Sequence, residues 1–247
     1  MEIHELTGRP LSHEHSPEAI QRRLKKGPRP SYLRDWVFGG IDGAVTTFAV
    51  VSGVVGANLP HSIILILGAA NLVADGFSMA AGNYSATKTE EEELAHIRRI
   101  EEHHIDVDPD GEREEIRQIF INKGFGGESL DQAVETVTVD RDRWVETMLV
   151  EEYGLSLETR TPMISAATTF AAFVLCGLVP LFPYLFGLPN PFAIAIGLNA
   201  LTFFAIGSGK SRWAIIPWWR SGLETLLIGS GAATLAWTVG YLLRHLA

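Results

Sequence analysis

Apolar residues gather in two long blocks of the chain, residues 36–84 and 163–246, which are almost free of charge. Because roughly 20 predominantly apolar residues are needed to cross the hydrocarbon of a bilayer, both blocks predict transmembrane helices. Breaks in the pattern at residues 58–61 and 187–191, and a loop that carries Lys210, Arg212 and Arg220, divide the two blocks further. The sequence therefore predicts five spans, over residues 36–59, 62–84, 163–186, 192–209 and 221–243.

The segment between the second and third spans has a helical pattern of apolar and polar residues. Thr89 precedes four glutamates and could cap a new helix, or the second span could continue through it as one long helix. Apolar residues at helical spacing predict a helix over 112–122 and two more over 129–137 and 140–153. We therefore expect a small helical domain here.

These patterns predict an all-α polytopic membrane protein, with five transmembrane helices and a helical domain inserted between helices 2 and 3. The expected organisation is a disordered N-terminal tail over 1–31, transmembrane helices 1 and 2 over 32–87, the inserted domain over 88–161, and transmembrane helices 3–5 over 162–247.

Charge predicts the orientation of these segments. Residues 88–160 hold 21 acidic and 9 basic residues, and since the whole chain has a formal net charge of −9, the rest of it is net basic. The basic residues gather in the N-terminal segment and around Lys210, Arg212 and Arg220. By the positive-inside rule these regions are cytoplasmic, so the inserted domain is expected in the cytoplasm as well.

Composition also argues against several classes of function. The acidic balance offers no basic surface for nucleic acid, although an acidic run by itself can be simply a solvated helix face. The single cysteine, Cys176, excludes an internal disulfide and a multi-cysteine metal site. No secretory signal peptide is visible at the N-terminus.

An aspartate, Asp42, lies about two turns inside the first predicted span. An ionisable side chain at membrane depth is costly, so it points to a function in the membrane. Gly39 and Gly43 flank it at the spacing of a helix-packing face. The alternative is an aspartate that caps or reaches the interface, which its short side chain makes difficult.

The second span carries a polar stripe formed by Asn71, Asp75 and Met79, spaced four residues apart. Residues at that spacing share one helix face, which we expect to line the interior of the bundle or a wet cavity. Met79 alone would be a core residue. Beside oxygen ligands its thioether becomes a candidate soft ligand for a transition metal.

The inserted domain holds pairs of ligand-type residues on shared helix faces. Glu101 and His104 are three apart, and so are Glu112 and Glu115, while Met148 and Glu152 are four apart. Glu-x-x-His on helices is the arrangement of carboxylate-bridged iron sites. Each pair is common on acidic helices, so the prediction of a metal site depends on their joint occurrence.

Two stretches, DWVFGGIDGAVTTFAVVSGVVGA and GAANLVADGFSMAAGNYSATKTE, resemble the two leading spans of the vacuolar iron transporter family. That family includes plant vacuolar iron transporters, yeast iron and manganese transporters and bacterial relatives. WVETMLVEEYGL and RSGLETLLIGSGAA extend the resemblance over the remaining chain, so that it covers residues from 32 to the C-terminus.

The resemblance implies a homodimer of five-span subunits, with the translocation path at the dimer interface and a cytoplasmic metal-binding domain. It implies export of Fe²⁺, sometimes Mn²⁺, from the cytosol in exchange for protons. The family's path-lining aspartate and methionine match Asp42 and Met79. Its metal-binding residues in the insert match Glu101, Glu112, Glu115, Met148 and Glu152.

Three positions depart from the family pattern. A span-two glutamate of the plant members falls at Asn71, with Asp75 one turn later. A second insert glutamate falls at His104, which a metal site can accept, and a second insert methionine falls at Leu149. These departures leave Mn²⁺, Zn²⁺ and Co²⁺ as candidate ions beside Fe²⁺.

Our hypothesis is a proton-coupled metal exporter for iron and manganese detoxification and homeostasis, in a bacterial plasma membrane, or in a vacuolar-type membrane if the source is eukaryotic. A membrane-anchored metal-binding or sensing protein is the second hypothesis, against which two intramembrane carboxylates argue. A di-iron oxidase is the third. It needs two Glu-x-x-His pairs and the insert has one, so no enzyme is expected.

Overall fold

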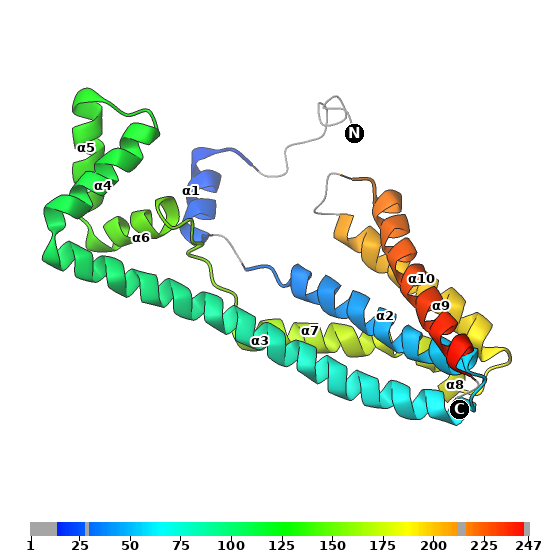
Figure 1. Ribbon diagram of the computed structural model, residues 1–247. Helices are drawn as coiled ribbons and strands as arrows, with labels where there is room; N and C mark the ends of the chain where they lie inside the picture. Colours follow the sequence, from blue (N-terminus) through cyan, green and yellow to red (C-terminus); the bar gives the residue numbers. More distant parts are fainter. Residues whose placement is uncertain (1–13, 28–29, 212–215, 245–247) are drawn as a thin grey trace. The chain divides into compact units, whose positions relative to one another are not determined.

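A computed structural model of the chain describes residues 14–27, 30–211 and 216–244, and every regular element in those residues is a helix (Figure 1). The all-α prediction is therefore confirmed. The elements are α1 Pro17–Lys26, α2 Leu33–Gly56, α3 His61–Val107, α4 Pro109–Asn122, α5 Gly127–Thr138, α6 Arg141–Glu151, α7 Pro162–Gly177, the 3₁₀ turn η2 Val179–Leu181, α8 Phe182–Leu185, α9 Pro191–Lys210 and α10 Trp218–Leu243.

Five segments are long and apolar enough to cross a membrane, as the sequence predicts. They are Leu33–Gly56, a window within His61–Val107, Pro162–Leu185, Pro191–Lys210 and Trp218–Leu243. The third is not one continuous α-helix, because α7 gives way to η2 and α8. Pro180 and Pro183 lack the N–H groups that an α-helix would need there.

The second span does continue as one long helix. α3 runs for 47 residues without a break. The Thr89 hydroxyl donates to the Ser85 carbonyl at 2.9 Å, so it lies inside the helix and caps nothing. Contacts divide the chain into a membrane unit, which holds α2, α3 up to Tyr84 and α7–α10, and an inserted unit, Ser85–Thr161.

Within the membrane unit, α2 packs against α7, α9 and α10. Gly39 and Gly43 form the contact face with α7, as predicted. A Cβ atom at Gly39 would collide with the Thr169 carbonyl oxygen, and one at Gly43 would collide with the Phe173 carbonyl oxygen. The absence of side chains thus lets the two helix backbones approach closely.

The inserted unit combines the end of α3 with three shorter helices, α4, α5 and α6. Side-chain caps begin two of them: Asp108 accepts from the Gly111 N–H, and Asp140 accepts from the Arg143 N–H. Their apolar faces meet in one core, made of Ile105, Ile116, Leu130, Val134, Val137, Trp144, Val145, Met148 and Leu149.

The segment 1–31 differs from the predicted disordered tail where it is described. α1 forms there because Ser16 caps it by accepting from the Ala19 N–H, a proline occupies the first turn, and Gly27 ends it with positive φ. Residues 1–13 lie outside the described part of the chain.

Candidate metal site and membrane carboxylates

Glu101, His104 and Glu112 converge in the inserted unit. Glu101 and His104 lie one turn apart on α3, and Glu112 reaches them from the first turn of α4. The Nδ1 atom of His104 lies 3.3 Å from Glu112 Oε1 and 3.7 Å from Glu101 Oε1. One ligand atom from each residue lies within 4.8 Å of the other two, a spacing that can hold a metal ion.

The sharp turn between α3 and α4 creates this geometry. α3 ends at Val107, and Pro109 opens α4 with its fixed φ at the first helical position. Asp108 caps the new helix between them. Because α4 begins directly after this turn, its fourth residue, Glu112, lies close to His104 and Glu101 in the last turns of α3.

The two glutamates are buried, with side chains only 1% exposed for Glu101 and 7% for Glu112. Within the described residues, the Oε2 atoms of both carboxylates are buried without a hydrogen-bond partner. Burying a carboxylate without a partner is costly, and a bound cation removes that cost. The donor set, two carboxylates and one imidazole, suits a divalent first-row metal.

Burial and neighbouring negative charges also disfavour the ionised form of the acids around this site. Burial raises the pKa of the Glu112 carboxyl to about 7, with further contributions from Glu115 and Glu101, while His104 lowers it. Burial, Glu115 and Glu101 likewise raise the pKa of Glu152. The acids therefore repel one another, and a divalent cation among them would relieve that repulsion.

The other predicted ligands of the insert, Glu115, Met148 and Glu152, do not belong to the close triad. Glu115 and Glu152 act on the same carboxylates electrostatically, although both residues are exposed and neither belongs to the close triad. Met148 is fully buried in the apolar core of the unit. Its role as a metal ligand, like those of Glu115 and Glu152, stays a prediction.

Sequence reasoning missed Tyr153. Its hydroxyl donates to Glu101 Oε1 at 2.9 Å, across 52 positions of sequence. Burial and the neighbouring Glu101 raise the pKa of the Tyr153 phenol, so it stays a hydrogen-bond donor. Only its place beside Glu152 hinted at this role, because the contact depends on how α6 packs against α3.

In the membrane unit, Asp42 of α2 and Asp75 of α3 lie near enough for their charges to repel. Asp42 is half-buried and Asp75 is exposed. The Asn71 amide donates to both Thr46 Oγ1 and Thr47 Oγ1 at 3.2 Å, so this part of the stripe faces α2.

Met79, the last residue of the stripe, is partly buried against the apolar core of the membrane unit. A second polar cluster, which the sequence did not reveal, joins α2, α3 and α7. Asn83 donates to Asp35 Oδ1 at 3.1 Å and to Thr169 Oγ1 at 2.8 Å. Asp35 is only 3% exposed, and its position at the very start of the span concealed this burial.

Comparison with known proteins adds an independent finding. A sequence model of the VIT family matches residues 33–241. The vacuolar iron transporter of Toxoplasma gondii is 32% identical over 225 residues, which cover 86% of this chain and 74% of that protein. Vacuolar iron transporter 2 of rice is 34% identical over 83% of this chain and 84% of its own length. Vacuolar iron transporter 1 of Arabidopsis thaliana is 30% identical over 86% of both chains.

Proposed function

Because the chain belongs to the VIT family, we propose that it exports divalent metal, Fe²⁺ and also Mn²⁺, from the cytosol in exchange for protons. The observation that carries this proposal is the triad of Glu101, His104 and Glu112, whose two carboxylates are buried. Among the described residues, each of these carboxylates has one oxygen without a hydrogen-bond partner. The triad belongs to a chain with five membrane-spanning segments and two neighbouring carboxylates among them.

The relatives are named as transporters, and the expectation that the chain is not an enzyme agrees with this. A di-iron oxidase would hold its metals with two Glu-x-x-His pairs. The triad contains one such pair, Glu101 and His104, and its third member comes from a separate helix.

Metal capture is the first step of the proposed mechanism. The triad binds Fe²⁺ or Mn²⁺ from the cytosol, and Glu115, Met148 and Glu152 complete or support the site. Carboxylate and imidazole ligands accept several first-row ions, so Zn²⁺ and Co²⁺ are further candidates. Metal binding must displace the proton that the raised pKa of Glu112 retains near neutral pH.

Translocation is the second step. Asp42 and Met79 from two copies of the chain hold the ion in a path at a homodimer interface, and Asp75 adds negative charge beside Asp42. Asn71 positions this part of α3 by its two bonds to α2. A carboxylate binds either a proton or a metal ion, so protonation of Asp42 from the far side releases the metal.

The proposed setting follows from charge and family. The N-terminus and the inserted unit face the cytoplasm by the positive-inside rule. The membrane is a bacterial plasma membrane, or a vacuolar-type membrane in a eukaryotic cell. Export from the cytosol then serves iron and manganese detoxification and homeostasis.

Flux through reconstituted protein tests the proposal. Proteoliposomes carrying a metal-sensitive dye inside are exposed to Mn²⁺ or Fe²⁺ on the side of the inserted unit. We expect the wild type to move metal and Asp42→Asn to lose flux while still binding metal. Glu224→Gln, which removes a carboxylate paired with Lys210, is the control and should transport normally.

A membrane-anchored metal sensor remains the competing function, because the triad alone could bind metal. Its distinguishing outcome is tight metal binding by the wild type without any flux.

A further inference from the structure

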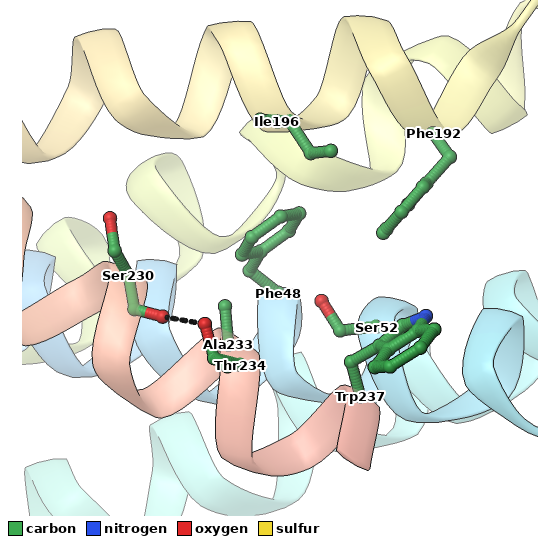
Figure 2. A pocket seen from close by; sticks show the side chains of 8 residues that line it. All are labelled: Phe48, Ser52, Phe192, Ile196, Ser230, Ala233, Thr234 and Trp237. Carbon is green, nitrogen blue, oxygen red and sulfur yellow. Dashed lines mark hydrogen bonds between the residues drawn. The ribbon is translucent and has the colours of Figure 1, made fainter. Parts of the chain in front are cut away.

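An apolar cavity of about 320 Å³ lies between α2, α9 and α10 in the membrane unit. Figure 2 shows Phe48, Phe192, Ile196 and Trp237 around it. The Ser52 hydroxyl, on a side chain buried to all but 1%, points between Phe48 and Phe192 and has no hydrogen-bond partner among the described residues. Neither the metal triad nor the membrane carboxylates line this cavity.

Trp237 also lines a second cavity, of about 650 Å³, at the end of the unit where α2 turns into α3. The rest of that wall comes from residues 55–59, Tyr241 and Arg244. The Trp237 and Tyr241 rings stack with centroids 5.3 Å apart, and the Arg244 guanidinium lies 4.1 Å from the Tyr241 centroid. The two cavities thus share Trp237 on α10, and a cation borders the second.

Acidic side chains are absent from the parts of the sequence that form the surroundings of Arg244. The sequence contains no Asp or Glu in residues 43–74, 176–223 or 225–247, which supply α2 beyond Asp42, α9 and nearly all of α10. Among the described residues no acid forms an ion pair with Arg244, and its guanidinium lies over the Tyr241 ring. A guanidinium in this setting is suited to a phosphate, which it can bind through two parallel hydrogen bonds.

We propose that the two cavities form one phospholipid site, with an acyl chain in the first and the lipid phosphate on Arg244 at the second. The flanking face of α10 supports a lipid occupant, because Leu235 is 70% and Leu242 67% exposed, as expected of side chains in contact with hydrocarbon. Trp237 and Tyr241 have the amphipathic rings that gather near lipid headgroups.

Native mass spectrometry of the full chain tests the site. The protein, purified in detergent, is titrated with phosphatidylglycerol, phosphatidylcholine or diacylglycerol that carry identical acyl chains. We expect one retained phospholipid per chain and roughly tenfold weaker retention of diacylglycerol, because the charged contact to phosphate is missing. Equal retention of the two phospholipids would mean that the site recognises the phosphate group alone. Stronger retention of phosphatidylglycerol would mean that the net negative charge of the lipid strengthens binding further.

Variants separate the two halves of the site. Ala233→Leu fills the first cavity and should abolish retention of the lipid. Gly231→Leu is the control, because it places a leucine two residues away where a Cβ atom meets nothing within 4 Å. Arg244→Gln should weaken phospholipid retention roughly tenfold to the diacylglycerol value. Arg220→Gln is its control, since Arg220 also stacks on a ring, Trp219, at the opposite end of α10. Circular dichroism checks that each variant is folded.

Two results would overturn the proposal. One is retention of phospholipid by Ala233→Leu or Arg244→Gln at the wild-type level. The other is a disulfide between two copies of the chain in a Thr234→Cys variant that also carries Cys176→Ser, because a second copy would then cover the cavity.

Discussion

The Nδ1 atom of His104 lies 3.3 Å from Glu112 Oε1, although the two residues belong to different helices. The turn at Asp108 and Pro109 brings them together, and it brings Glu112 beside Glu101 as well. A site made from two helices depends on the angle between them, so changes at this turn should affect metal binding as strongly as changes of ligands.

Replacing Glu112 with glutamine should weaken Mn²⁺ binding at least tenfold. The change keeps the size of the side chain but removes one anionic ligand, and even changes of supporting residues cost about 10- to 100-fold in metal affinity. Isothermal titration calorimetry on the full chain in detergent measures this. Glu114→Gln is the matched control, because Glu114 lies on α4 but faces Arg117 outside the triad. Equal losses in both variants would contradict a specific site.

Metal affinity should rise with pH up to about 7 and then level off. Burial raises the pKa of Glu112 to about 7, so below that pH a proton must leave before metal binds. Where one proton competes, affinity changes by about tenfold per pH unit. Calorimetry at pH 5.5, 6.5 and 7.5 measures the slope, and Glu112→Gln should flatten it.

The same shifted group gives a prediction for stability without metal. A carboxyl whose folded pKa lies above its unfolded value binds its proton more tightly in the folded state. Its stabilising contribution is therefore present below the unfolded pKa and is lost as the pH rises through about 7, the folded value. Thermal unfolding of wild type relative to Glu112→Gln should show that difference, and a constant difference from pH 4 to 8 would contradict it.

Replacing Tyr153 with phenylalanine should weaken metal binding severalfold and destabilise the metal-free inserted unit. The hydroxyl fixes Glu101 through one oxygen, and its loss leaves a buried carboxylate less satisfied, at a cost of about 1–3 kcal/mol. Unfolding and calorimetry on the same variant measure both effects. Tyr84→Phe changes an exposed tyrosine of α3 and should alter neither. Unchanged affinity in Tyr153→Phe would mean that the contact has no part in the site.

Adding a methyl group at Gly43 should destabilise the membrane unit by about 1–3 kcal/mol, the usual cost of overpacking. The added Cβ would collide with the Phe173 carbonyl oxygen of α7, which backbone packing holds in place. Gly82→Ala, where a Cβ meets nothing within 4 Å, should be neutral or stabilise the helix. Thermal unfolding in detergent compares the two, and equal stability would contradict the close α2–α7 contact.

The sequence predicts the spans well because hydrocarbon imposes a length and a composition that are read directly along the chain. Gly39 and Gly43 are predicted equally well, since their spacing defines a packing face. The pairing of Glu101 with His104 is local and visible as well. The arrival of Glu112 at the same point depends on the α3–α4 turn, and the Tyr153 contact depends on the packing of α6, neither of which a spacing rule contains.

Other differences have equally local causes. The sequence shows the prolines that divide α7 from α8, yet an apolar run of this length still predicts one span. The strongly polar composition of the α1 segment favours disorder when it is considered alone. The segment is helical because Ser16 caps its first turn. Burial of Asp35 requires Asn83 and Thr169 from two other helices, so no single segment reveals it.

Simultaneous recording of metal and proton movement in proteoliposomes tests the central claim most directly. A metal-sensitive dye and a pH-sensitive dye are enclosed together, and Mn²⁺ or Fe²⁺ is added on the side of the inserted unit. We expect metal to enter wild-type vesicles while the lumen becomes more alkaline, and both signals to vanish with Asp42→Asn but to persist with Glu224→Gln. Metal binding by wild-type protein without entry of metal into the vesicles would contradict transport.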